Sequence, residues 1–258
     1  MSANKFKPKT VLLVPDVHAK VADSLDRMRV LRAAMSAKHI KLADVVQIGD
    51  LWDFESLCLH DKESPEWYQR NLQADIDAGM VGLDILADIA RTHGAKLHVT
   101  EGNHENRYAT WLKSDNRLLT SSFPKTVRAL IKQERPELKV NYVDFLKPLT
   151  LYGAAFAHYF VSGVMNRPQG GERPASNILR TQLMTTICGH THTMDYAQRT
   201  RADGKRVHAL VSGSFVDPAG DFKYAGAARK LWWCGVHLLH FTAPGEFDLE
   251  SISLARMS

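Results

Sequence analysis

The chain has 258 residues, of which 45% are hydrophobic, and this is enough to build one well-buried domain. Charged residues make up 24%, and no long segment is both polar and low in complexity, which argues against wholesale disorder. The apolar run over residues 11–14 is too short for a signal sequence or a membrane span, so we expect a soluble, cytoplasmic protein.

Cysteine content and net charge narrow the class further. The three cysteines, Cys58, Cys188 and Cys234, are scattered, so we expect buried free thiols rather than a disulfide framework or a zinc knuckle. The net charge of +5 suits an anionic partner such as nucleic acid or a phosphorylated molecule. A solvated basic surface with no partner explains the same charge equally well.

The first hundred residues alternate between short apolar runs and helical patterns. Strands are predicted over residues 11–14, 45–48 and 97–100, and helices over residues 21–37 and from Leu72 to a stop at Gly94. This alternation predicts parallel βαβ units with right-handed crossovers.

The second half consists mainly of predicted strands, over residues 149–157, 185–188, 207–212, 231–241 and 247–254. Residues 167–182 are rich in turn formers at first and then helical. We therefore predict the α/β fold class, as a layered β-sandwich of mixed sheets flanked by helices. Residues 1–10 would form a polar tail, and residues 11–258 a single domain.

Side chains of the kinds that bind metals follow five of the predicted strands. They are Asp16 and His18, then Asp50 and Asp53, then Asn103, His104 and Glu105, then His158, and last His190 and His192. Asp-x-His and His-x-His place two donors on alternate residues of an extended segment, so both can point to one side. One such motif arises often by chance, but five at strand ends predict a common site.

The donor types indicate which metals the site would bind. Mixed imidazole and carboxylate ligation favours Mn, Fe, Zn, Co or Ni over Mg and Ca, which prefer shells made only of oxygen. The motifs contain no thiolate, which argues against a structural zinc site.

Together these motifs resemble the full motif set of the calcineurin-like metallophosphoesterase family, in its small stand-alone bacterial or viral form. The resemblance runs from Asp16 to His192 and implies an α/β/β/α sandwich with two divalent metal ions, Mn²⁺ first among the candidates. It implies one ion bound by Asp16, His18, Asp50 and His192, and a second bound by Asp50, Asn103, His158 and His190. Asp50 would therefore bridge the two ions.

The resemblance also implies hydrolysis of a phosphate ester by a metal-bound hydroxide. His104 would protonate the leaving oxygen or stabilise charge in the transition state, and Asp53 would orient its imidazole. A loop cap is the alternative for Asp53, and Glu105 receives no role. Only Asp16 and Asp50 among the ligands are anionic, so two divalent ions leave a positive centre that suits an anionic substrate.

The side chains that would bind the substrate are less clearly indicated. Phosphoprotein phosphatases of the superfamily have Arg-Gly where Phe54-Glu55 follow Asp53 here, so that arginine grip on phosphate is missing. The arginines that could replace it, or that are ordinary surface residues, are Arg107, Arg167, Arg173 and Arg180. The aromatic residues near the motif loops, which either stack on bases or pack in the core, are Trp52, Trp67, Tyr68, Trp111, Tyr159 and Phe160.

Three functions follow from these observations. We expect a phosphodiesterase that acts on nucleotide or nucleic-acid substrates. The alternative is a phosphomonoesterase that acts on small molecules or on phosphoprotein. A metal-containing nucleic-acid-binding module is the non-enzymatic alternative, because fold does not imply function. The sequence does not indicate the oligomeric state.

Overall fold

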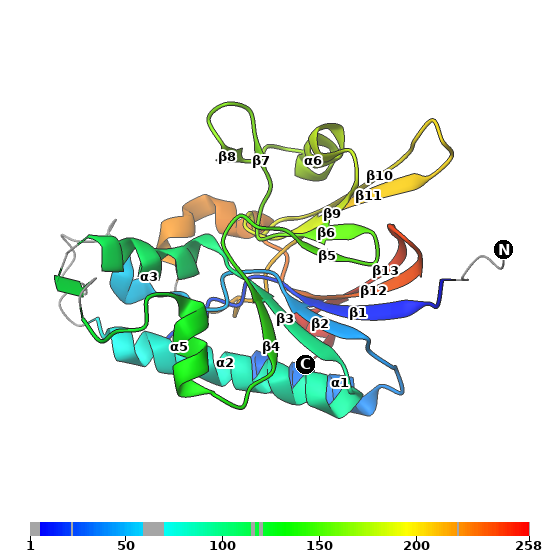
Figure 1. The fold of residues 1–258 in the computed structure, drawn as a ribbon. Coiled ribbons are helices and arrows are strands. Elements are labelled where there is room, and N and C mark those ends of the chain that lie inside the picture. The colour runs from blue at the N-terminus through cyan, green and yellow to red at the C-terminus, as the bar shows by residue number, and fades with distance from the viewer. Residues whose placement is uncertain are drawn as a thin grey trace.

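A computed structural model describes residues 6–21, 23–58, 70–114, 117–118, 121–220 and 222–257. Two β-sheets pack face to face, and helices cover the outer face of each sheet (Figure 1). The predicted α/β sandwich of mixed sheets flanked by helices is therefore confirmed.

The first sheet has six strands, and four of them run parallel. In spatial order they are β13 (Glu246–Ser253), β12 (Gly235–Ala243), β1 (Lys9–Val14), β2 (Asp44–Gln47), β3 (Lys96–Thr100) and β4 (Val140–Val143). Strands β1 to β3 are mutually parallel, as the alternation of strand and helix predicts, and β4, which was not predicted, continues the parallel set. Strand β12 joins β1 antiparallel. The carboxyl ends of β1, β2 and β3 consequently lie at one edge of the sheet.

Helices α1 (Asp26–Ala37) and α2 (Leu72–His93) connect the first three strands and cover the outer face of this sheet. The Asn71 side chain caps the start of α2, and Gly94 ends it in the left-handed conformation, with φ 62°. Helix α1 begins five residues later than predicted. Leu25 adopts φ 55° and interrupts the helical pattern, which leaves the residues after His18 to form a loop.

The shorter helices were not predicted individually. They are η1 (Glu55–Leu57), α3 (Asn103–Lys113), α5 (Val127–Glu134) and α7 (Leu254–Met257). Helix α3 starts inside one of the metal-type motifs, so it fixes the position of that motif.

The second sheet has five strands, in the order β10 (Met194–Thr200), β11 (Arg206–Ser212), β9 (Thr185–Cys188), β6 (Ala154–Phe156) and β5 (Leu149–Leu151). Helix α6 (Pro174–Gln182) packs on its outer face. The inner faces of the two sheets share an apolar core that includes Leu13, Val46, Phe156 and Ile187. Strands β7 (Val161–Ser162) and β8 (Arg167–Pro168) form a separate small hairpin.

Two strand predictions were wrong in detail. The strand expected over residues 149–157 is a hairpin of β5 and β6, because Tyr152 and Gly153 both have positive φ, as tight hairpin turns require. The strand expected over residues 231–241 begins only at Gly235. A 3₁₀ segment, η4 (Lys223–Leu231), precedes it, and Trp233 N donates to the carbonyl of His192 instead of entering the sheet.

All three cysteines are free thiols, as predicted, but only Cys188 is buried, whereas burial was expected for all three. Within the ranges that the structure describes, no helix is both long enough and apolar enough to cross a membrane.

Candidate metal centre

The structure brings the five motifs together at one edge of the sandwich. Asp16, Asp50 and Asn103 follow β1, β2 and β3 of the first sheet. His158 follows β6 of the second sheet, and His190 follows β9. Strands β6 and β9 run parallel, so both sheets present their carboxyl ends to the same place.

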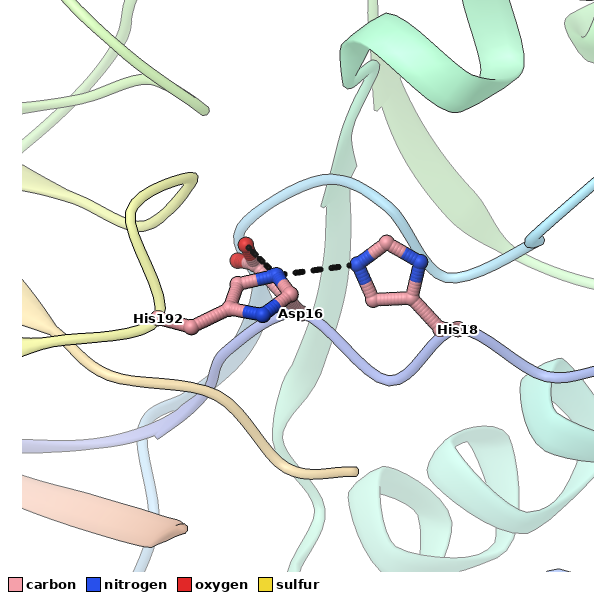
Figure 2. Close-up of side chains that lie close together, drawn as sticks. All are labelled: Asp16, His18 and His192. Carbon is pink, nitrogen blue, oxygen red and sulfur yellow. Dashed lines mark hydrogen bonds and ion pairs between the residues drawn. The ribbon is translucent and has the colours of Figure 1, made fainter. Parts of the chain in front are cut away.

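Asp16, His18 and His192 form the first cluster, and all three side chains are buried. Figure 2 shows the ring of His192 between the Asp16 carboxylate and the ring of His18. Nε2 of His192 lies 3.2 Å from Oδ2 of Asp16 and 3.1 Å from Nε2 of His18. Three potential ligand atoms therefore converge from two distant segments of the chain.

Asp50, His158 and His190 form the second cluster. Nε2 of His158 lies 3.2 Å from Oδ2 of Asp50 and 3.2 Å from Nδ1 of His190. The side-chain oxygen of Asn103 lies 2.9 Å from Nε2 of His158. All four residues that the resemblance implies for the second ion thus share one location.

Asp50 lies between the two clusters. Its Oδ2 is 3.2 Å from Nε2 of His158 and 3.7 Å from Nε2 of His18. This is the position that a bridging carboxylate needs. His18, Asp50 and His104 form a third grouping in which the same carboxylate takes part, and the sequence did not predict His104 as a ligand.

The donor set fits a divalent transition-metal ion. Oδ1 of Asp16 is buried and has no hydrogen-bond partner, which is costly for a carboxylate oxygen. The two imidazole nitrogens of His18 and His192 face each other, and they satisfy each other only if one of them carries a proton. A cation held between such atoms would satisfy them, and imidazole with carboxylate ligation suits Mn, Fe, Zn, Co or Ni.

Electrostatics in the cluster keep the carboxylates charged. Burial alone would raise the pKa of Asp50, but the neighbouring His158 and His104 outweigh it and hold the pKa well below its usual range. Burial would likewise lower the pKa of His158, but Asp50 and Asp16 outweigh it and raise the pKa to about 9. Burial, with His158 next in importance, lowers the pKa of His190 to about 4. In the metal-free protein, the two carboxylates thus favour the protonated form of the His158 imidazole.

The backbone is strained at four of the predicted ligands. His18, Asp50, His190 and His192 have φ values of 50°, 52°, 73° and 59°, in the left-handed region that non-glycine residues avoid. Each such residue costs about 1–3 kcal/mol, so the surrounding structure must hold it in place. Strain of this kind concentrates at functional sites.

Two glycines let the backbone pass close to the ligand carboxylates. A Cβ on Gly102 would lie 2.1 Å from Oδ1 of Asp50, and a Cβ on Gly189 would lie 2.1 Å from Oδ1 of Asp16. The glycines in these motifs are thus required by close approach to the cluster.

Glu105, to which the sequence assigned no role, joins two motif loops. Its carboxylate accepts hydrogen bonds from the backbone N–H groups of Asp50, Trp52 and Gly102. Burial, followed by the charge of Asp50, raises the pKa of Glu105 to about 7. The available signal was a glutamate at the third position of the helix that begins after Gly102, as in a capping box.

His104 lies beside the clusters and is held by Asp53. Nδ1 of His104 lies 2.8 Å from both the backbone carbonyl and Oδ1 of Asp53. Asp53 Oδ1 also lies 3.2 Å from Nδ1 of His18, so one carboxylate contacts two imidazoles. Burial would raise the pKa of Asp53, but the hydrogen bonds with His104 and His18 outweigh it and lower the pKa. Its position is the one that an orienting carboxylate would occupy.

Arg107 is the one predicted arginine that reaches this site in the described structure. Its guanidinium donates to the carbonyl of Asp53, and one nitrogen lies 3.1 Å from Nε2 of His104. Arg167, Arg173 and Arg180 are exposed, and no contact of the described residues joins their side chains to the clusters.

The aromatic residues fall into different places. Trp52 is fully buried, and Trp111 packs between Tyr108 and Phe123. Phe160 packs on the core beneath α6. Only Tyr159 among the described members of this set contacts the rings of His158 and His190. Trp67 and Tyr68 lie outside the described residues.

Two further rings that the sequence did not single out for the site touch the first cluster. The ring centroids of Trp232 and His192 lie 4.2 Å apart, and those of Phe222 and His18 lie 6.2 Å apart. They come from a segment far along the chain that carries no metal-type motif, so no local signal marked them.

A cavity of about 710 Å³ opens elsewhere, between α2, β3 and β4. Its lining includes Arg91, Lys96 and Asn141 and none of the motif residues, so it is separate from the clusters.

Comparison with known proteins gives little independent support. The sequence matches no protein-family profile and, at a significant level, no curated protein. One solved structure aligns over 96% of this chain and 100% of its own, with 13% identity and a TM-score of 0.39. A purple acid phosphatase from yellow lupin (Lupinus luteus) seeds aligns over 98% of this chain, with 12% identity and a TM-score of 0.39. This chain spans 53% of that phosphatase chain. Likeness at this level is too low to support a function, so the geometry of the site must do so.

Proposed function

We propose that this protein is a metal-dependent phosphoesterase that uses two divalent transition-metal ions, with Mn²⁺ the first to test. The observation that carries the proposal is the position of Asp50, whose Oδ2 lies between His18 and His158 and so joins two donor clusters. Two ions, when bound, supply Lewis acidity towards phosphate oxygens and activate water at neutral pH.

The chain's own residues supply a proton donor beside the clusters. Asp53 contacts Nδ1 of His104, and this fixes the ring so that Nε2 faces the ligand groups, 3.9 Å from Oδ2 of Asp50. Asp50, Asp53 and their hydrogen bonds raise the pKa of His104 although burial, the largest single influence, would lower it. A proton on Nε2 is then available to the leaving oxygen.

Arg107 would bind the phosphate and release His104 for this step. A guanidinium has no acceptor atom, so its contact with Nε2 of His104 is a hydrogen bond only while that nitrogen is unprotonated. A phosphate oxygen would give Arg107 a better, charged partner. Nε2 of His104 could then carry its proton towards the ester.

We propose a phosphodiester of a nucleotide or nucleic acid as the substrate. The net charge of +5 supports an anionic polymer or nucleotide, and Arg107 provides a guanidinium beside the clusters that suits a phosphate group. A small phosphomonoester is the competing substrate.

The test compares two chromogenic esters after the metal has been stripped and Mn²⁺ restored. The proposal expects bis-p-nitrophenyl phosphate to be cleaved faster than p-nitrophenyl phosphate, and an Asp50→Asn variant to be inactive towards both. Turnover of the monoester alone would keep the phosphoesterase and remove the diester preference. A protein that binds Mn²⁺ but hydrolyses neither ester, and hydrolyses neither single-stranded nor duplex DNA, would support the metal-containing binding module instead.

A further inference from the structure

Residues 213–220 and 222–235 form a segment that is hydrogen-bonded to the candidate metal centre. The backbone N–H of Phe215 donates to the carbonyl of Asp16, and the N–H of Trp233 donates to the carbonyl of His192. Ser214 and Gly235 then tie the two ends of the segment together through further backbone hydrogen bonds. Two of the three residues of the first cluster, Asp16 and His192, thus also hold this segment in place.

The same segment places two aromatic rings against the cluster. The Trp232 ring lies edge-to-face with His192, with centroids 4.2 Å apart, and Trp232 is partly exposed. The buried ring of Phe222 lies 5.4 Å from Trp232 and 6.2 Å from His18. The partly exposed ring of Trp232, packed on the buried ring of Phe222, therefore borders the site on the side of His18 and His192.

Cations gather on these rings. The Lys20 ammonium, two residues beyond His18, lies 4.6 Å from the Phe222 centroid, although the side chain is only 9% exposed. The Arg229 guanidinium lies 5.8 Å from the same centroid. Together they add positive charge beside the candidate metal centre, and positive charge attracts an anionic ligand. Their presence favours a ligand with negative charge and a flat, apolar part.

We propose that Trp232 and Phe222, with Lys20 beside them, form a subsite for the nucleobase of a nucleotide whose phosphate is held at the metal centre. The inference rests on the proposed function and deepens it, because it names the group that the enzyme reads beyond the phosphate. Stacking on an aromatic side chain tolerates any base, since every base has a π-face, and an adjacent cation contacts the backbone phosphate. Discrimination would lie between substrates with and without a base, not among bases.

The test measures equilibrium binding, so it does not depend on turnover. A nucleoside phosphonate, whose P–C bond resists hydrolysis, is compared with methylphosphonate, which has no base, on the Mn²⁺-loaded protein by calorimetry. The base should tighten binding about tenfold or more, and a Trp232→Leu variant should bind the two ligands alike. Tryptophan fluorescence should be quenched by the nucleoside phosphonate in the wild type and not in Trp232→Leu.

Trp233→Leu is the matched control, because Trp233 is the next residue and stacks on His237 away from the cluster, with ring planes 23° apart. It should keep the preference for the base. Melting temperature and metal content verify that each variant is folded and loaded, and Phe222→Leu replaces Trp232→Leu if the latter does not fold. Equal binding of the two phosphonates by the wild type overturns the subsite, as does a preference that survives Trp232→Leu in folded protein.

These results separate the subsite from the proposed hydrolysis. Cleavage of chromogenic diesters without a preference for the nucleoside phosphonate would keep the phosphoesterase and overturn the subsite. A preference that depends on Trp232, in a protein that cleaves no ester, would keep the subsite and overturn the phosphoesterase.

Discussion

At the scale of single residues, His104 is the side chain whose setting best defines a chemical task. It is buried, Asp53 fixes its Nδ1 from two atoms, and Arg107 lies against its Nε2. A histidine that only filled space would not need a carboxylate, a carbonyl and a guanidinium around one ring. The arrangement controls which nitrogen faces the ligand groups, and this is what a proton donor requires.

Replacement of His104 should separate chemistry from metal binding. We expect His104→Ala to lower kcat by about 10²–10⁴-fold, the usual contribution of a positioned acid or base, with metal content unchanged. The measurements are steady-state kinetics on a phosphodiester and metal analysis of the purified variant. Full activity in a metal-replete variant would remove His104 from the mechanism. Loss of metal instead would favour the third grouping, in which His104 is a ligand with His18 and Asp50.

At the scale of elements, the strand ends and their glycines define the shape of the centre. Gly102 lies at the start of α3, and a Cβ there would enter the Asp50 carboxylate at 2.1 Å. Neither the Asp50 carboxylate nor the Gly102 backbone can move easily. Oδ1 of Asp50 also accepts a hydrogen bond from the backbone N–H of His104, and the Glu105 carboxylate accepts one from the backbone N–H of Gly102. The loop after β2 and the start of α3 thus fit together without room for one methyl group.

Gly102→Ala should therefore impair metal binding although it adds a single carbon. We expect affinity for Mn²⁺ to fall at least tenfold, as measured by calorimetry, because the carboxylate between the two clusters is displaced. Gly170→Ala is the control, since a Cβ there meets nothing within 4 Å and its φ is not in the left-handed region. Equal metal affinity in both variants would show that Asp50 does not need its observed position.

Strands of both sheets also meet in a polar network away from the metal centre. Oδ1 of Asp44 on β2 lies 2.8 Å from Nε2 of His98 on β3, and the other oxygen accepts from the hydroxyl of Tyr152. The amide of Asn141 on β4 in turn lies 3.0 Å from Nδ1 of His98. Burial would raise the pKa of Asp44, but the hydrogen bonds from His98 and Tyr152 outweigh it and lower the pKa below 3.8.

Because the folded protein lowers this pKa, the ionised form stabilises the fold at pH values above 3.8, and the stabilisation disappears as the pH falls through the lowered value. Asp44→Asn should thus lower the free energy of unfolding by about 1–3 kcal/mol at pH 7. In metal-free protein, the difference from wild type should shrink below about pH 4. Urea unfolding at both pH values measures it, with Asp88→Asn as the control, because Asp88 is partly exposed and pairs with surface arginines, so we expect a change within about 0.5 kcal/mol. A deficit in Asp44→Asn that does not vary with pH would contradict the role of the charge.

How far the sequence predicted the molecule depended on how local each signal was. Strands such as β1, buried on both faces, and the regular apolar face of α2 follow from patterns within one segment, and both were predicted. The split of residues 149–157 depended on two positive φ values, of which only Gly153 gave a sequence signal. The contact of Glu105 with Gly102 had a local signal in the capping-box pattern, but its contacts with Asp50 and Trp52 join distant segments. The contacts of Trp232 and Phe222 with the first cluster also join distant segments, and no single-segment pattern contains that information.

At the scale of the whole molecule, the candidate centre is also a joint between the two sheets. Asp16, Asp50 and Asn103 come from the first sheet, and His158, His190 and His192 come from the second. Without an ion, buried carboxylates and imidazoles of both sheets meet there on strained backbone, with Oδ1 of Asp16 unsatisfied. A ligand that binds these groups only in the folded state stabilises that state by mass action.

Metal binding should therefore raise the melting temperature of the whole protein, not only support catalysis. At a free Mn²⁺ concentration of about 100 times Kd, the added stability is about 2.7 kcal/mol. For a chain of this size, that corresponds to a rise of about 5–10 °C over the chelator-treated protein in scanning calorimetry. Asp50→Asn should show a much smaller rise, since it weakens the carboxylate that lies between the sheets' two clusters. If Mn²⁺ left the wild-type melting temperature unchanged, or raised that of Asp50→Asn equally, the ion would not be held where the two sheets meet.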